Sequence, residues 1–213
     1  MLLISSILQV THKRGDNMIR VNLQLFGGRG ASGGGSGSGG QSVTEEGAAE
    51  DWFEYEYANL MVEYIRTGVM PTEDMYGNKL SKQQREKLAA EAELIQRMGE
   101  NTNSGYNTLH RGMVMDLEEV RALSPGEQYT FRTLSATSPD RKLAGVYSNV
   151  ENRGGEGVPV MFEIQRAGGI NGFKASSAEV VIPKGSSFRI TRNYMDEDGV
   201  VHVSLYASKK KKR

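Results

Sequence analysis

The sequence of 213 residues contains no cysteine and only three histidines. Without cysteine, neither a disulfide framework nor a thiolate metal site can form. The histidines, His12, His110 and His202, are too scattered for a zinc motif. A long hydrophobic run is also lacking, because the apolar opening at 1–10 is too short for a transmembrane helix. Its charges follow it, unlike those of a signal peptide. We therefore expect no bound metal and no membrane association.

No charge of one sign dominates, since 26 basic and 26 acidic side chains cancel. The distribution is uneven: acidic residues outnumber basic ones at 41–208, whereas residues 1–40 and the tail 209–213 are basic. The surface of a nucleic-acid-binding domain should be basic. We therefore expect no nucleic-acid partner, and interpret the basic tail as a solubilising extension, with phosphate contacts as the alternative.

Glycine is abundant, with 26 residues, and is concentrated ahead of the predicted domain. Residues 27–40 consist of glycine and serine with one alanine and one arginine. This composition costs too much backbone entropy to fold and predicts a flexible linker. We divide the chain into an N-terminal segment (1–26), a linker (27–44), one domain (45–207) and a basic tail (208–213).

The N-terminal segment carries two further indications. Residues 22–26 read NLQLF and are followed by GGRG, which is similar to the starts of head proteins of tailed phages and prophages. This similarity predicts a location in the bacterial host cytoplasm or in the virion, with phage head proteins as partners of the segment. Met18 is an alternative start, because the preceding KRGD at 13–16 could be translated from a ribosome-binding sequence.

Two amphipathic helices are predicted at the start of the domain. At 45–67, apolar residues recur at spacings of three and four, acidic residues crowd the first turns, and Gly68 marks the end. At 81–98, Ser81 and Gln84 form a capping box and Gly99 stops the helix. We interpret the apolar face of each helix as core packing. These faces consist of Phe53, Tyr57, Leu60, Met61, Tyr64 and Ile65 in the first helix and Leu88, Ala92, Ile95 and Met98 in the second.

After residue 101 the pattern changes to strands, which are rich in β-branched and aromatic residues and bounded by turn signals. The last two strands form a hairpin around the turn at 196–199. Helices followed by strands predict an α+β fold with largely antiparallel sheets. The strands are predicted at 108–115, 129–137, 158–165, 178–182, 188–194 and 200–206.

The first candidate functional stretch is Arg111 followed by Gly112. A guanidinium in an apolar strand is costly unless it meets an anion, and its planar fork suits a diphosphate or a carboxylate. Glycine beside it leaves the backbone open to a flat ligand. An arginine on the solvent face of the strand is the alternative.

The second stretch is the hydroxyl cluster at 135–138. Clustered hydroxyls at a strand end can orient a sugar or fix a carboxylate by hydrogen bonding. They can equally cap the following helix, with Ser138 as N-cap and Pro139 at the first helical position. The functional interpretation therefore depends on Ser135 and Thr137.

The third stretch is Glu179, a single acidic residue at the head of an apolar strand and just after the Gly-rich loop 168–172. A charge at that position disfavours folding unless it faces a cleft. A solvated carboxylate at the strand end is the alternative.

Taken in order, these three stretches resemble the arginine–serine–glutamate class of mono-ADP-ribosyltransferases, which includes clostridial actin-modifying toxins and phage-encoded enzymes. The resemblance covers about residues 101–206, and the helices at 45–98 occupy the place of the family's N-terminal helical part. It implies two small, mainly antiparallel sheets that form a cleft for NAD. The implied activity is transfer of ADP-ribose from NAD, as a substrate, to a side chain of an acceptor protein from the bacterial host or the phage, without a metal.

The resemblance also implies roles for the candidate residues. Arg111 would hold the diphosphate, and the backbone of Gly112 would meet the nicotinamide amide. Ser135 or Thr137 would position Glu179. Glu179 would bind the 2′-hydroxyl of the nicotinamide ribose and stabilise the oxocarbenium-like transition state.

The loop 168–177 would present the acceptor protein, with Phe173, Lys174 and Ser177 as its contacts. Ser177 stands where members that modify arginine carry the first Glu of Glu-x-Glu, which favours another acceptor side chain or NAD hydrolysis. Ala136 stands where the family has its first serine. Both departures favour the alternative function, a non-catalytic phage head or accessory interaction module with a degenerate NAD site.

Overall fold

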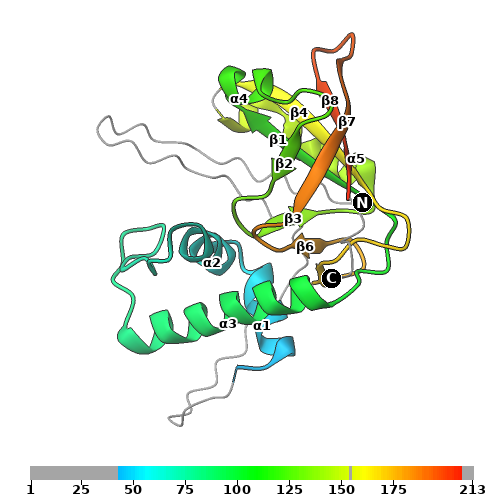
Figure 1. Ribbon diagram of the computed structural model, residues 1–213. Coiled ribbons are helices and arrows are strands. Elements are labelled where there is room, and N and C mark those ends of the chain that lie inside the picture. Colours follow the sequence, from blue (N-terminus) through cyan, green and yellow to red (C-terminus); the bar gives the residue numbers. More distant parts are fainter. Residues whose placement is uncertain (1–42, 154, 208–213) are drawn as a thin grey trace, which may run out of the picture.

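Helices form one layer of the molecule and two β-sheets form the rest (Figure 1). The computed structural model describes residues 43–153 and 155–207. The predictions for the N-terminal segment, for the linker up to residue 42 and for the basic tail lie outside the described residues.

The helical layer consists of α1 (Glu45–Phe53), α2 (Tyr55–Thr67) and α3 (Lys82–Asn101). The prediction of one helix over 45–67 was wrong, because Glu54 is extended (φ −81°, ψ 111°) and separates α1 from α2. This break lets two shorter helices each bury an apolar face against α3, with Trp52 of α1 and Met61 of α2 both fully buried.

Helix α3 begins with the predicted capping box, in which Ser81 and Gln84 bond each other's backbone N–H. The prediction that Gly99 stops the helix was wrong, since α3 continues to Asn101. A Cβ at position 99 would lie 3.1 Å from Cδ of Pro183. Glycine suits this position because α3 packs closely against the turn after β6.

Five strands form the larger sheet, in the order β1-β4-β8-β7-β2. Its pairs are antiparallel except β4 with β8, which run parallel. Three short strands form the smaller, antiparallel sheet in the order β3-β6-β5. The α+β class with two mainly antiparallel sheets is therefore confirmed. The strands are β1 (Thr108–Met115), β2 (Gln128–Thr130), β3 (Ser135–Thr137), β4 (Val158–Gln165), β5 (Phe173–Lys174), β6 (Val180–Ile182), β7 (Ser187–Met195) and β8 (Val201–Tyr206).

The prediction of a single strand at 129–137 was wrong, because β2 and β3 belong to different sheets. The segment between them crosses from one hydrophobic core to the other: Phe131 is buried in the core under the large sheet, and Leu134 in the core under the helices. Thr133 fixes the crossing by donating to the carbonyl of Val62 in α2 (2.9 Å).

The smaller sheet lies between the helical layer and the larger sheet (Figure 1). Side chains alternate between the two faces of a strand. Accordingly, Val180 and Ile182 of β6 belong to the core between the sheets, whereas Val181 belongs to the core under the helices. Strands β3 and β6 are buried throughout, so this part of the sheet is held by both cores.

Two short helices flank the large sheet, α4 (Leu117–Arg121) and α5 (Arg141–Gly145), and two 3-10 turns, η1 (Val146–Ser148) and η2 (Val150–Arg153), follow α5. The N-cap of α5 is Asp140, whose Oδ1 accepts from the N–H of Lys142 (2.8 Å). The prediction of Ser138 as the N-cap was therefore wrong. Its hydroxyl accepts instead from the N–H of Asp140 (3.0 Å), and its backbone pairs with His110 of β1.

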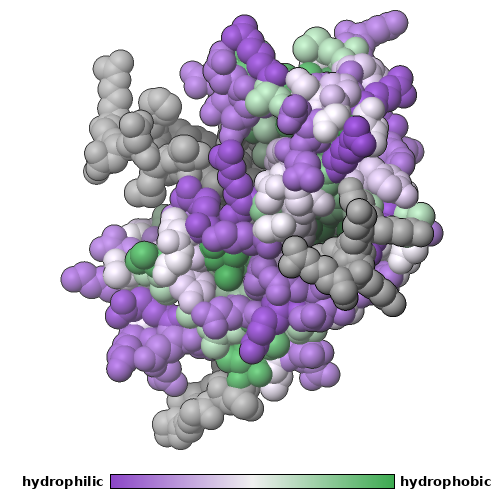
Figure 2. Space-filling view, viewed as in Figure 1, coloured by the Kyte–Doolittle hydropathy of each residue, from purple (hydrophilic) through white to green (hydrophobic). Residues whose placement is uncertain are grey.

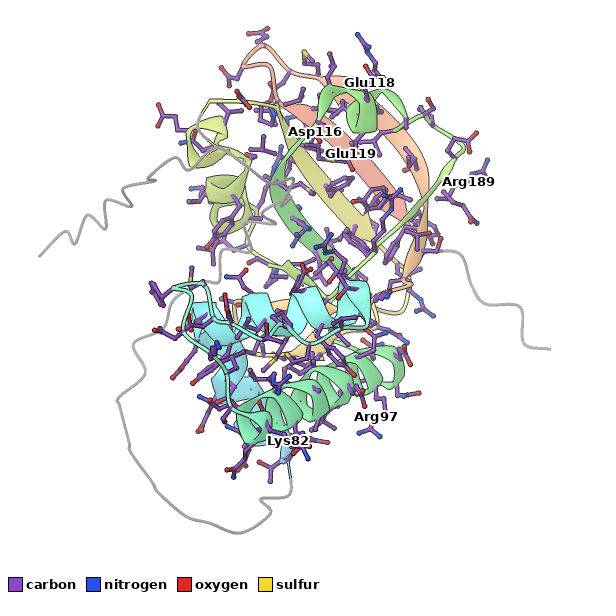
Figure 3. All side chains as sticks on the ribbon, turned by 90° about the vertical axis from the view of Figure 1, so that its left-hand side faces the viewer. Lys82, Arg97, Asp116, Glu118, Glu119 and Arg189 are labelled. Carbon is purple, nitrogen blue, oxygen red and sulfur yellow. The ribbon has the colours of Figure 1, made fainter. Side chains whose placement is uncertain are left out.

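The visible surface is mainly hydrophilic, with small separate hydrophobic groups (Figure 2). The acidic side chains of Asp116, Glu118 and Glu119 gather around α4, at the end of the large sheet remote from the helical layer (Figure 3). Among the described residues, no helix is long and apolar enough to cross a membrane. That same part of the chain contains no group of three or more His, Asp or Glu suited to a metal ion.

Candidate active site

Glu179 stands immediately before β6 and its side chain is completely buried. A tight turn places it there: the N–H of Ser176 donates to the carbonyl of Glu179 (3.1 Å), and Ser176 Oγ accepts from Ala178 N (3.1 Å). The register of β3 with β6 then fixes the start of the strand, with Thr137 opposite Val180. The carboxylate is thus enclosed by the fold and is not the solvated group of the alternative interpretation.

The Glu179 carboxylate accepts a hydrogen bond from the first helix. Nε1 of Trp52 donates to Oε1 of Glu179 over 2.8 Å, between two side chains that are both fully buried. Sequence reasoning did not assign Trp52 a functional role. Its one signal is that the chain has a single tryptophan, and a buried indole N–H normally needs an acceptor.

Arg111 lies on the side of β1 that faces the core between the sheets, two residues from the fully buried Leu109. Its side chain is half-buried, and Nη1 donates to the carbonyl of Ala136 in β3 (2.6 Å). Burial lowers the pKa of the guanidinium, while electrostatic interactions with Tyr129 and Glu179 act to raise it. The guanidinium and the carboxylate therefore interact electrostatically across the edge of the smaller sheet.

The hydroxyls of β3 bond to the backbone. Ser135 Oγ donates to the carbonyl of Thr133 (3.2 Å), and Thr137 Oγ1 donates to the carbonyl of Val180 (2.7 Å). Because side chains alternate along the strand, both lie on the face opposite to Ala136, which belongs to the same core cluster as Trp52. The side of β3 turned towards Trp52 thus presents a methyl group at position 136.

Gly112 is enclosed by the chain itself. A Cβ at this position would lie 2.1 Å from the carbonyl oxygen of Ala144 and 3.0 Å from the N–H nitrogen of Ser148. The sequence interpretation explained this glycine by the approach of a ligand. In the structure the close approach is that of α5 and η1 to β1.

Two tyrosines that sequence reasoning missed lie near the charged pair. Tyr147 of η1 is half-buried; its burial, together with the charge of Glu179, raises its pKa to about 12. Tyr129 of β2 packs on the ring of Phe162, with centroids 4.8 Å apart. Burial raises its pKa, which the charge of Arg111 opposes. Neither residue belongs to a local motif that singles it out.

The loop before Glu179 divides into buried and exposed parts. Phe173 is buried against the helical layer and pairs with Val181 in the small sheet, so its ring supports the loop and does not face a partner. Lys174 and Ser177 are exposed. Both adjoin Tyr106. The Lys174 ammonium lies 5.4 Å from the centroid of the Tyr106 ring, and the Tyr106 hydroxyl donates to the Ser177 carbonyl (3.0 Å).

Helices followed by two curled sheets form the fold of solved ADP-ribosyltransferases. Vis toxin, an ADP-ribosyltransferase from Vibrio splendidus, superposes with a TM-score of 0.56 at 21% identity, covering 78% of this chain and 75% of its own. Exoenzyme S from Pseudomonas aeruginosa, solved with human 14-3-3 protein beta and Carba-NAD, gives 0.52 at 16% identity, covering 77% and 73%. No protein-family model matches the sequence, and no curated protein matches it. The chain therefore has the ADP-ribosyltransferase fold.

Proposed function

We propose that the chain is a mono-ADP-ribosyltransferase that transfers ADP-ribose from NAD to a protein side chain, with Glu179 as its catalytic carboxylate. The observation that carries this proposal is the burial of that carboxylate at the head of β6, together with its electrostatic interaction with the half-buried guanidinium of Arg111. Buried charges are costly unless function or pairing retains them. In this fold they suit two parts of a dinucleotide substrate, the diphosphate and the nicotinamide ribose.

The proposed reaction breaks the bond between C1′ of the nicotinamide ribose and the nicotinamide nitrogen. Nicotinamide leaves with the bonding electron pair, and a lone pair of the acceptor side chain forms the new bond to C1′ while the acceptor loses a proton. Positive charge grows on the ribose at the transition state, as in glycoside hydrolysis. A fixed anion at Glu179 interacts more strongly with that cationic ribose than with the neutral ground state, which is the condition for catalysis.

Arg111 is proposed to hold the diphosphate. Its bond to the carbonyl of Ala136 fixes the direction of the guanidinium from β1 across to β3. Because guanidinium donors lie in a planar fork, the group can bond a phosphate at two points. Ser135 and Thr137 contribute by holding β3, since their hydroxyls bond the backbones of Thr133 and Val180.

The acceptor is proposed to bind over the exposed part of the loop before Glu179, where Lys174 and Ser177 face solvent. Vis was solved in complex with agmatine, a small guanidine. Ser177, two residues before Glu179, favours a different acceptor side chain or water for this chain. Incubation of bacterial host lysate with labelled NAD, followed by identification of the modified residue, tests this assignment. The phage or prophage source stays a prediction of the sequence.

The decisive test of the proposed function is Glu179→Gln. The amide is nearly isosteric but neutral, so it removes the charge that stabilises the ribose cation. We expect NAD cleavage to fall by at least about 1000-fold, with the melting temperature little changed. Glu127→Gln, at an exposed position in the turn before β2, is the matched control and should leave turnover unchanged. Turnover retained by the Glu179→Gln variant would contradict the proposal.

A non-catalytic interaction module is the second candidate, and Ala136 favours it, because a methyl group stands where the family has a serine. Calorimetry of the wild-type protein with NAD separates the two. A degenerate site should not bind NAD, whereas an active one should bind it and release nicotinamide.

A further inference from the structure

We propose that Trp52 is a positioning residue for Glu179, whose carboxylate it fixes by donating the indole N–H. This inference rests on the proposed function and deepens it, since it concerns the same carboxylate. Trp52 comes from the first helix, 127 residues away along the chain, and meets Oε1 at 2.8 Å. The positioning donor would thus come from the helical layer and not from strand β3.

The chemistry of the donor sets the direction of the effect. An indole N–H only donates, so it favours the ionised form of a carboxyl group that accepts its bond. The contact lies between side chains without solvent exposure, where a charge-assisted hydrogen bond is stronger than in water. Trp52 therefore holds both the orientation and the charge of Glu179.

Helix packing fixes the indole. Trp52 belongs to the buried cluster that joins the helices to the small sheet. The neighbouring Asp51 binds Lys87 of α3, with 2.8 Å between Oδ2 and Nζ. This ion pair and the buried ring together hold α1 against α3, so the N–H is aimed at the carboxylate before any substrate arrives.

Strand β3 offers a reason why this donor is needed. Ala136 pairs with Val181, and both belong to the cluster that contains Trp52. The methyl group of Ala136 cannot donate a hydrogen bond. Arg111 of β1 and Tyr147 of η1 also act on the Glu179 charge, through their electrostatic interactions with it.

The first test is Trp52→Phe, which keeps an aromatic ring and removes the N–H. We expect kcat for NAD cleavage to fall about 10- to 100-fold, the loss typical of a hydrogen bond to a charged group. KM should change by less than about threefold, because Trp52 does not touch substrate. The acid limb of the kcat–pH profile should move to higher pH, since the ionised carboxylate loses a donor. A purely structural role for Trp52 would not move this limb.

Two further variants control for packing. Met61→Leu alters the same buried cluster at similar volume and should leave both kcat and the pH profile unchanged. Adding Ala136→Ser to Trp52→Phe places a hydroxyl on the same face of β3 and should restore part of the lost kcat. A Trp52→Phe protein with wild-type kcat and an unshifted pH profile would overturn this inference. The proposed function would be unaffected by that result, because Glu179→Gln tests it separately.

A second measurement does not depend on turnover. Because the chain has one tryptophan, its proton NMR spectrum contains a single indole N–H resonance. We expect this resonance to move upfield in Glu179→Gln, since the charge-assisted bond is lost, and to stay in place in Glu127→Gln. If Trp52→Phe does not fold, this comparison of the two glutamate variants tests the inference in its place. An indole resonance unmoved by Glu179→Gln overturns the inference, and a wild-type protein that neither binds nor cleaves NAD overturns it together with the proposed function.

Discussion

At the scale of single residues, the two charges of the proposed site differ in how the fold holds them. The Glu179 carboxylate accepts from a side chain, Trp52, whereas the Arg111 guanidinium donates to a backbone carbonyl. A backbone partner cannot be lost by substitution of its side chain. The guanidinium is therefore the more robustly placed of the two groups.

Replacing Arg111 with lysine keeps the charge and removes the planar fork. We expect the dissociation constant for NAD to rise by about tenfold, because a two-point contact with the diphosphate becomes a point charge. Calorimetric titration measures this change. Arg189→Lys, at an exposed position of β7 (Figure 3), is the matched control and should bind NAD as the wild type does. Equal affinities for the Arg111→Lys and wild-type proteins would remove this role.

The candidate residues were predictable from the sequence to different extents. Arg111 and Glu179 could be singled out because a charge in an apolar strand is locally conspicuous. Trp52 and Tyr147 could not, because an isolated aromatic residue fits core packing equally well. Their relation to Glu179 arises only when segments far apart in the chain fold together.

At the scale of elements, the close contact between β1 and α5 depends on Gly112. A Cβ there would lie 2.1 Å from the Ala144 carbonyl oxygen, a distance that no side chain can occupy. We expect Gly112→Ala to lower the free energy of unfolding by about 2–4 kcal/mol, because either β1 or α5 must shift. Urea denaturation measures the loss.

Gly145→Ala is the control for this substitution. A Cβ at position 145 would meet only the Met161 methyl group, at 3.6 Å, which is an ordinary contact. Since Gly145 ends α5, alanine there should be neutral or stabilising by up to about 1 kcal/mol. Equal stability of the two variants would show that α5 can move without cost.

Elements with regular periodicity were predictable, and those shaped by long-range contacts were not. Strands β1 and β4 coincide with the predicted 108–115 and 158–165, because their apolar runs are long. The division of 129–137 into β2 and β3 was missed, since consecutive apolar residues do not reveal that Phe131 and Leu134 enter different cores. The break at Glu54 was missed for a similar reason, because the helical periodicity continues through it.

At the scale of the whole molecule, the helical layer contains a buried carboxyl group with a perturbed pKa. Glu91 of α3 is 1% exposed and adjoins Asp51 and Lys87. Burial raises its pKa to about 8, Asp51 adds to the increase, and Lys87 opposes it. The folded protein therefore keeps a proton on Glu91 at pH values where the unfolded chain, with a pKa near 4.5, has lost it.

This difference predicts how stability depends on pH. Between about pH 4.5 and 8 the folded state binds more protons at Glu91 than the unfolded state, so its contribution to stability is full below this window and is lost as pH rises through it. Glu91→Gln, which stays neutral, should be more stable than wild type by roughly 4 kcal/mol at pH 8 and equally stable near pH 4. Urea denaturation at several pH values checks this.

Glu86→Gln is the matched control, because Glu86 lies on the same helix with its side chain 66% exposed. It should leave the pH dependence unchanged. An identical pH dependence in wild type and Glu91→Gln would show that the folded protein carries Glu91 in its charged form.

The position of Trp52 has a practical consequence. The chain's sole indole is also its sole strong intrinsic fluorophore, and it touches the carboxylate at the proposed reacting centre. Emission from the unlabelled protein thus reports on this single point of the molecule. If NAD binds as proposed, a change in this emission should follow its binding without a dye.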